Sequence, residues 1–327
     1  MKKKKYGILI IAAAFLLMIV YNGGCRAPLE EGVPPGGETP GIPEEIRGGD
    51  EEEPVLNVYM HETGEVQEMS MEEYIEGVVA AEMETDWPEE ALAAQAIIAR
   101  SFTLQKIDED GGLPERNAHA STDIEEFQAY DAERVNENVR NAVDKTRGEV
   151  AVYNGEFIRA WFHAYAGPRT ALADEGLDFE DNPPYIHIVE SPAQDIIDPE
   201  EADWSADFPL DQVSSVVSEE TGEDPGEITS AEVAEEGPSG RAALVSFNDT
   251  EIPANDLRMG LGSTEMRSTF IEEIQINNGN LEMSGTGYGH GVGMCQWGAK
   301  ALAEEGDTAE DIVSYYFDDI TVVSLWE

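Results

Sequence analysis

The sequence predicts an α+β fold of mixed helices and antiparallel hairpins, with an acidic, loop-rich insertion from Ala173 to Gly240. Three observations predict this class. Apolar residues recur at helical spacing in the first half of the chain. Asn154-Gly155 and Asn278-Gly279 each separate two apolar runs, which is the signal of a two-residue hairpin turn. Strand and helix patterns do not alternate regularly, as they would in a parallel α/β sheet.

Local signals set the bounds of each expected element. A capping box opens one helix, Pro is tolerated in the first turn of the next, and glycines end two others. The expected elements are a strand from Val55 to Tyr59, a helix capped by Ser70, a helix from Ala91 to Leu104 opened by Asp86 to Glu89, a helix from Ala132 to Thr146 ended by Gly148, hairpin strands Val150 to Tyr153 and Phe157 to Phe162, a hairpin from Ile274 to Met283, and helices from Trp297 to Glu305 and Ala309 to Phe317.

The charge of the chain is extreme, with 69 acidic against 19 basic side chains in 327 residues. Such a surface repels phosphate backbones and anionic lipid, which argues against nucleic acid as a partner. Because the carboxylates are spread along the whole chain, we interpret them as a halophilic adaptation, in which salt screens their repulsion. Binding of a cation or a basic partner is the alternative.

The N-terminus has the pattern of an export signal. Four lysines precede the uncharged apolar run from Tyr6 to Tyr21. We expect residues 1–25 to be an uncleaved anchor whose positive flank stays in the cytoplasm. Lipidation at Cys25 is a second possibility and simple secretion a third. All three place the rest of the chain outside the cytoplasmic membrane.

Residues 26–54 are expected to form a linker. This stretch holds six prolines, six glycines and many glutamates, with almost nothing to bury. Proline stiffens such a segment and like charges extend it, so it should act as a spacer. The remainder, residues 55–327, is predicted to be one domain.

Glu82 is the most informative carboxylate. It follows Ile75 and Val78 at helical spacing, so it continues an apolar stripe, whereas the other acids lie in polar runs. Burial raises the pKa of a carboxyl and keeps it protonated near neutral pH, as a general acid requires. The alternative, which spacing alone favours, is a structural residue that caps a helix or pairs with Arg100.

A glycine-rich run extends from Gly285 to Gly298, with glycine at every other position up to Gly293. Its spacing is not a dinucleotide fingerprint, and no phosphate-loop lysine follows. Glycines let a backbone approach a ligand or another strand closely. The side chains in and after the run suit sugar recognition by stacking and by amide hydrogen bonds: Tyr288, His290, Gln296 and Trp297. A tight turn packed on a sheet is the alternative.

His163 and Cys295 leave other chemistries open. His163 lies at the end of an expected strand, where it could be structural, orient Glu82 or hold a substrate hydroxyl. Cys295 with His163 or His290 would make a cysteine peptidase or amidase, but His290 lies only five residues before Cys295. A weak candidate cation set is His119 with Asp123, Glu125 and Glu126.

Several motifs, taken in order, resemble the stage II sporulation protein D family, the SpoIID/LytB domain. The resemblance runs from about Val55 to the C-terminus and is weakest from Ala173 to Gly240. The matching stretches are Glu73 to Met83, Trp87 to Ala96, Ala99 to Ser101, Phe127 to Tyr130, Phe162 to Gly167, Arg258 to Phe270 and Tyr288 to Ala299.

The resemblance implies an anchored lytic transglycosylase that cleaves the bond between N-acetylmuramic acid and N-acetylglucosamine in peptide-stripped peptidoglycan, leaving 1,6-anhydro ends. It also implies a cell-wall amidase of the engulfment machinery as partner. The family's catalytic acid maps onto Glu82, and the elements should surround a glycan-binding cleft. The residues of the matching motifs that we assign to substrate binding are Arg100, Ser101, Gln128, Tyr130, His163, Tyr288, His290 and Gln296. A non-catalytic amidase enhancer is the alternative.

Two departures from the family pattern bear on metals and on the nucleophile. Some members carry cysteine-containing metal-site residues just before the block that matches Phe127 to Tyr130. Here Phe127 stands where a cysteine is common, so we expect no zinc and no other cofactor, with His119 as a remnant of such a site. Cys295 often corresponds to a serine in relatives, which argues against a nucleophilic role.

Overall fold

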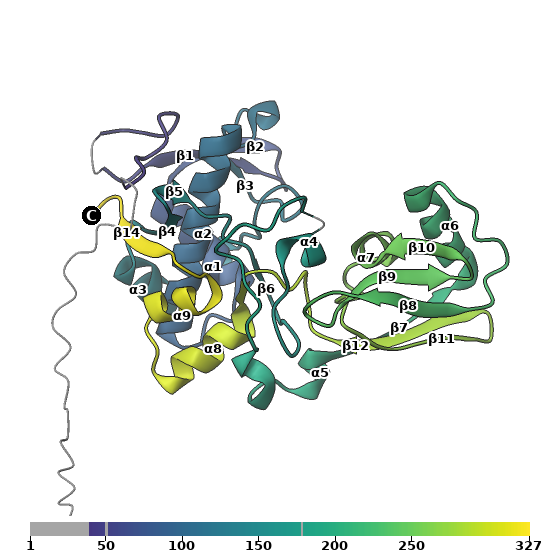
Figure 1. Ribbon diagram of the computed structural model, residues 1–327. Helices are drawn as coiled ribbons and strands as arrows, with labels where there is room; N and C mark the ends of the chain where they lie inside the picture. The colour runs from purple at the N-terminus through teal and green to yellow at the C-terminus, as the bar shows by residue number, and fades with distance from the viewer. Residues whose placement is uncertain (1–38, 50–51, 178) are drawn as a thin grey trace, which may run out of the picture. The chain divides into compact units, whose positions relative to one another are not determined.

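The computed structural model describes residues 39–49, 52–177 and 179–327 (Figure 1). All of them belong to one compact unit, Val33–Glu327. The expected anchor, residues 1–25, lies outside the described residues. Among the residues described, no helix is long and apolar enough to cross a membrane.

The first hydrophobic core is built around one long helix, α2 (Glu89–Asp110). Alanine and isoleucine dominate its sequence, and it is buried on most faces because other elements surround it. Those elements are α1 (Met71–Glu82), α3 (Glu137–Lys145), β4 (Glu149–Tyr153), α8 (Gln296–Glu305) and α9 (Ala309–Tyr316). The helix continues beyond the expected Leu104 and ends at Gly111, which adopts a left-handed φ of 70°.

Helix caps agree with the sequence signals. The Ser70 side chain accepts a hydrogen bond from the Glu73 backbone N–H at 3.3 Å and starts α1. Thr308 forms a reciprocal capping box with Asp311 and starts α9. The expected helix from Ala132 to Thr146 is divided into a 3-10 turn, η2 (Ala132–Arg134), and α3.

Three small sheets accompany this core. Their orders are β2 (Glu65–Ser70), β1 (Val55–Met60), β3 (Ala120–Ser121); β14 (Thr321–Ser324), β4, β5 (Glu156–Phe157); and β13 (Met294–Cys295) with β6 (Phe162–His163). Asn154 and Gly155 both have positive φ, as the predicted hairpin requires. Its second strand ends at Phe157, however, because Phe162 and His163 pair in parallel with β13.

A second hydrophobic core lies within residues 203–286 (Figure 1). Its elements are β7 (Asp203–Pro209), α6 (Leu210–Thr221), β8 (Ala231–Glu236), β9 (Ala242–Phe247), β10 (Thr250–Pro253), α7 (Ala254–Leu261), β11 (Ile271–Asn277) and β12 (Asn280–Thr286). They form two antiparallel sheets, β10-β9-β8 and β11-β12-β7. The α+β class is confirmed, and part of the expected loop-rich insertion is regular structure. In β8, Ala231 and Val233 are half-buried among exposed glutamates, which hides the strand signal.

Four short elements complete the part of the chain that the structure describes. They are η1 (Pro114–Arg116), α4 (Ala173–Gly176), η3 (Pro192–Asp195) and α5 (Pro199–Ala202).

The end of the expected linker packs against the body. Ile42 and Ile46 are buried in the first core, and the Pro54 carbonyl accepts a hydrogen bond from the Met71 N–H at 2.9 Å. The folded body therefore begins before Val55.

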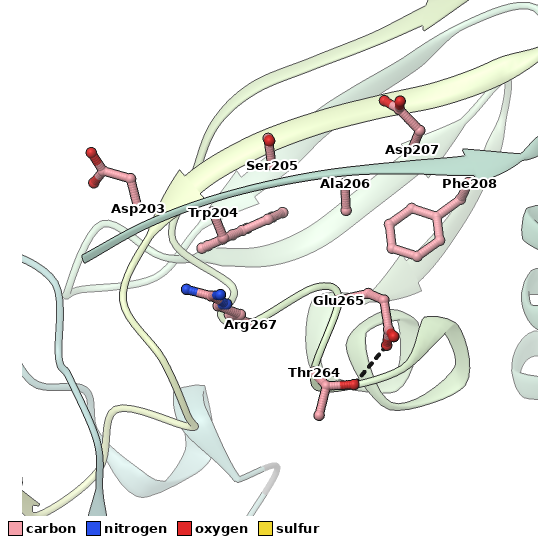
Figure 2. Close-up of a pocket in the computed structure, with 9 residues that line it drawn as sticks. All are labelled: Asp203, Trp204, Ser205, Ala206, Asp207, Phe208, Thr264, Glu265 and Arg267. Atoms are coloured by element: carbon pink, nitrogen blue, oxygen red, sulfur yellow. Dashed lines mark hydrogen bonds between the residues drawn. The ribbon is translucent and has the colours of Figure 1, made fainter. Parts of the chain in front are cut away.

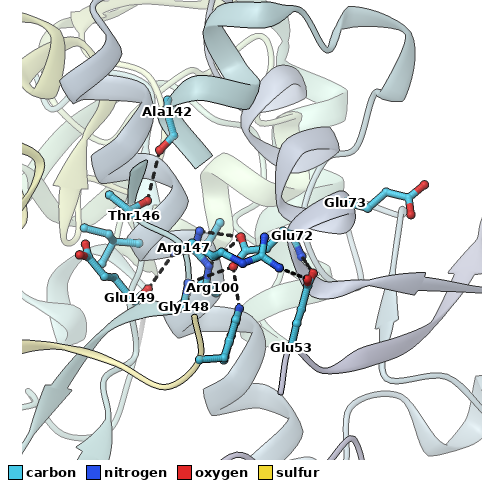
Figure 3. Close-up of polar contacts among 12 residues, drawn as sticks. Glu53, Glu72, Glu73, Arg100, Ala142, Thr146, Arg147, Gly148 and Glu149 are labelled. Carbon is cyan, nitrogen blue, oxygen red and sulfur yellow. Dashed lines mark hydrogen bonds and ion pairs between the residues drawn. The ribbon is translucent and has the colours of Figure 1, made fainter. Parts of the chain in front are cut away.

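A buried ion pair connects α1 to α2 (Figure 3). Glu72 accepts two hydrogen bonds from Arg100, at 2.8 and 3.2 Å, and further bonds from the Gly148 N–H and the Trp326 indole. The Glu72 backbone N–H in turn donates to Glu53 of the expected linker. This network joins the start of the body to its last residues.

Candidate active site

Glu82 is the last residue of α1 and lines a cavity of about 560 Å³. The apolar stripe before it, including Ile75 and Val78, is fully buried, so the helix delivers the carboxyl from the core to the cavity wall. Glu82 itself is half-buried. Among the described residues that line the cavity, it is the only carboxylate.

The surroundings of Glu82 favour its protonated form. Desolvation by burial is the dominant cause and raises its pKa to about 7. Two donors oppose this shift: the Ala129 backbone N–H lies 3.0 Å from Oε1, and the Gln296 amide lies 3.4 Å from Oε2. The carboxyl is therefore poised to give up or accept a proton near neutral pH.

The rest of the cavity is largely aromatic. Its lining comes from α1, α2, the loop after β3, the segment around β6, the glycine-rich run and the start of α8: Ala81, Glu82, Phe102, Ile124, Phe127, Gln128, Trp161, Phe162, His163, Ala164, Tyr288, Gly289, His290 and Gln296. Flat apolar faces of this kind suit the C–H faces of sugar rings.

Five of the predicted binding residues therefore meet around Glu82. They are Gln128, His163, Tyr288, His290 and Gln296. Gln296 also lies 3.4 Å from the Gln95 side chain, which fixes its amide beside the carboxyl. Burial lowers the pKa of both His163 and His290, in the latter case to about 3, so both imidazoles are neutral.

Glycines allow the close packing of this wall. A Cβ on Gly289, where φ is 108°, would lie 2.8 Å from the Cβ of His163. At Gly293, with φ 72°, it would lie 2.1 Å from the Trp161 carbonyl oxygen. The glycine-rich run is thus both a strand partner and one side of the cavity.

Arg100 and Ser101, predicted as binding residues, do not line the cavity. Arg100 is fully buried and pairs with Glu72, not with Glu82. The Ser101 hydroxyl donates to the Ile97 carbonyl and accepts from the Ala151 N–H. The structure gives both residues a role in holding α2 to its neighbours.

Tyr130 and Trp297 also lie outside the cavity lining. Tyr130 stacks on Tyr74, with ring centroids 5.8 Å apart, where a side chain larger than Gly77 would collide with it. Trp297 packs against Trp87 at 4.9 Å. Their motif positions reflect packing around α1 and α8.

Cys295 has the environment of a structural residue. It is fully buried, and burial raises the pKa of its thiol. Its sulfur caps α8 by accepting from the Gly298 N–H at 3.3 Å. A thiol that is buried and protonated is a poor nucleophile.

His119 has a structural contact as well. Its Nδ1 accepts a hydrogen bond from the Asn57 backbone N–H at 3.0 Å. In the part of the chain that the structure describes, no group of three or more His, Cys, Asp or Glu side chains is arranged to hold a metal ion.

A second hollow, of about 380 Å³, follows β7 (Figure 2). Figure 2 shows Asp203 and Asp207 on one face of the strand, and Trp204 on the other, toward Arg267. Within the described residues, no buried polar atom without a hydrogen-bond partner lines this hollow. We therefore place the candidate site at Glu82.

The sequence did not predict which apolar side chains form the cavity wall, nor that Glu72 is the centre of a buried hydrogen-bond network. Phe102, Ile124 and Trp161 carry no motif that distinguishes a wall from a core. Glu72 had a visible signal, since it lies three residues before Ile75 at helical spacing, but an acidic residue in the first turn of a helix is equally expected from the helix dipole.

Comparisons with known proteins agree with the motifs. A family model described as stage II sporulation protein matches residues 59–153. An uncharacterized protein of Brachyspira hyodysenteriae is 30% identical over 260 residues, which cover 79% of this chain and 68% of the relative. The stage II sporulation protein D of Bacillus subtilis is 29% identical over 80% of this chain and 77% of its own. The amidase enhancer of the same organism is 28% identical over 76% of this chain but only 40% of its own length.

Proposed function

Because the chain belongs to the stage II sporulation protein D family, we propose that it is a peptidoglycan lytic transglycosylase acting in sporulation. The observation that carries this proposal is the carboxyl of Glu82, which has a pKa of about 7 and is the only carboxyl that the described residues contribute to a cavity walled by aromatic side chains. Its substrate is the glycan strand stripped of peptides. Its products carry 1,6-anhydro-muramic ends.

One carboxyl suffices for this reaction. Glycosidases that use water or an enzyme nucleophile need two carboxylates on either side of the scissile bond. In the proposed reaction the 6-hydroxyl of the muramic acid is the nucleophile. The cavity's lining, with Glu82 as its only carboxylate among the described residues, fits that requirement.

The proton moves in a closed cycle. Glu82 donates its proton to the glycosidic oxygen as the bond to the muramic C1 breaks. The resulting carboxylate, stabilised by the Ala129 N–H and the Gln296 amide, then takes the proton of the 6-hydroxyl as that oxygen bonds to C1. Glu82 ends protonated, and no water is consumed. Positioning the 6-hydroxyl over C1 supplies much of the acceleration.

The test is an incubation of the full-length protein, in detergent micelles and high salt, with peptide-free glycan strands. Mass spectrometry should find anhydro ends with wild type and none with Glu82→Gln. Reducing ends would instead indicate hydrolysis and a second carboxylate. Turnover by a folded Glu82→Gln variant would remove Glu82 from the mechanism.

A second candidate is a non-catalytic module that binds peptidoglycan and activates an amidase. It is favoured by the similarity to the amidase enhancer. Glycan binding without cleavage, together with faster release of peptides by an added cell-wall amidase, would decide for this candidate. In both cases we propose that residues 1–25 hold the protein at the membrane, with the body outside.

A further inference from the structure

Two buried side-chain atoms at the cavity have no hydrogen-bond partner among the residues that the structure describes. They are Nε2 of His163 and Oε1 of Gln128, and both residues line the cavity beside Glu82. The residues are 4% and 2% exposed, so bulk solvent does not readily satisfy them. A buried polar atom left unpaired costs roughly 1–3 kcal/mol, which favours a ligand that supplies the missing bond.

The neighbours determine that both atoms are acceptors. His163 Nδ1 lies 3.1 Å from the Val292 carbonyl oxygen, which can only accept, so the imidazole proton is on Nδ1 and Nε2 presents a lone pair. The Thr103 hydroxyl donates to the Ala99 carbonyl and must accept from Gln128. The amide nitrogen of Gln128 therefore faces Thr103, and its oxygen is the free atom.

His290 shows by contrast that this arrangement is specific to His163. The two rings lie 5.5 Å apart between centroids, and both line the cavity. Nδ1 of His290 accepts from the Val292 N–H at 3.1 Å, so the proton of this neutral imidazole is on Nε2, which is a donor. His290 therefore offers a ligand no free acceptor, although the sequence predicted it as a binding residue equally with His163.

We propose that His163 Nε2 and Gln128 Oε1 are a pair of acceptors that bind hydroxyl or acetamido N–H donors of a sugar and hold its ring against the aromatic wall beside Glu82. The identity of that sugar as a unit of the glycan strand rests on the function proposed above. The pair selects for neutral, donor-bearing groups. A carboxylate offers no donor and would be repelled by both lone pairs, so the lactyl group of muramic acid must lie away from this pair.

The test measures binding of soluble peptide-free glycan strands by calorimetry, using full-length protein made inactive by Glu82→Gln. Adding His163→Phe should weaken binding about tenfold, as should Gln128→Leu, because each removes one buried acceptor. Adding His163→Gln should restore part of the loss, since an amide oxygen can accept in the same place. Thermal melts establish that each variant is folded.

Tyr316→Phe is the matched control. The Tyr316 hydroxyl is also buried without a partner in the described part of the chain, but it does not line the cavity, so its removal should leave the dissociation constant unchanged. Binding within twofold of the parent in folded His163→Phe and Gln128→Leu would overturn the proposal and leave only ordered water at these atoms. If His163→Phe does not fold, Gln128→Leu and His163→Gln decide. Cleavage by the Glu82→Gln parent would refute the proposed mechanism but not the acceptor pair, which is judged on binding alone.

Discussion

Replacing Glu82 by glutamine should make the protein more stable above neutral pH while abolishing cleavage. Burial raises the pKa of Glu82 from an ordinary value of 4.5 to about 7. Between these two values the unfolded chain has released a proton that the folded protein still holds, so the stability of wild type falls as the pH rises. The full difference corresponds to at most about 3 kcal/mol.

The glutamine variant lacks this titration. Its amide oxygen can still accept from the Ala129 N–H, and it resembles the protonated acid in shape. Near pH 4.5 the two proteins should therefore differ by no more than about 1 kcal/mol. By pH 8 the variant should be the more stable by about 2–3 kcal/mol.

Urea unfolding of both proteins across this pH range, at constant high salt, gives the difference directly. The many surface carboxylates titrate alike in the two proteins and cancel in the subtraction. A difference that stays constant with pH would show that the Glu82 carboxyl is not held protonated by burial. The same titration should appear in catalysis, as a fall in rate when the pH rises through about 7.

Three further outcomes are expected. Arg100→Met should lower the free energy of unfolding by about 3–5 kcal/mol, because it leaves the Glu72 charge buried without its partner. Urea denaturation measures this loss, and the glycan affinity of the folded variant should stay unchanged. Cys295→Ser should keep cleavage within about twofold, since a serine hydroxyl can also accept from the Gly298 N–H; inactivity of the folded variant would restore the nucleophile hypothesis. Melting temperature should rise from low to molar salt as repulsion within a chain of net charge −50 is screened, and a flat profile would count against salt adaptation.

Local signals predicted α1, α2, α8, α9 and the β11–β12 hairpin because the causes of these elements are local, but α6, α7 and the β9–β10 hairpin were not predicted. The Ser70 cap, the Asn278-Gly279 turn and the Gly306 stop all depend on a few neighbouring residues. The parallel pairing of β6 with β13 joins residues more than a hundred positions apart, and no local pattern encodes it. The strands within residues 203–236 were not predicted, because acidic side chains interrupt the alternation of apolar and polar residues that indicates a strand.

The candidate site was predictable to the level of residue type but not of orientation. The apolar stripe placed Glu82 at a half-buried position on the cavity wall, and the motifs brought His163, His290 and Gln296 to the same place. The spacing of residues along α2 could not show that Arg100 pairs with Glu72 and not with Glu82. Residue spacing also could not predict that His163 and His290 differ in which ring nitrogen carries the proton. That difference depends on the backbone group that each Nδ1 contacts, a carbonyl for His163 and an N–H for His290.

The acidic surface and the weakly charged cavity both suit recognition of a ligand in concentrated salt. In concentrated salt, attraction between a charged ligand and a charged protein is screened over a few ångströms, so ion pairs contribute little to recognition. The proposed contacts, stacking on the aromatic wall and hydrogen bonds to His163 and Gln128, do not depend on long-range charge. Burial keeps Glu82, the one carboxyl that the cavity lining contributes among the described residues, partly protonated near neutral pH. A chain can therefore carry a large negative charge on its surface and still present a weakly charged site to the neutral hydroxyl and acetamido groups of a sugar.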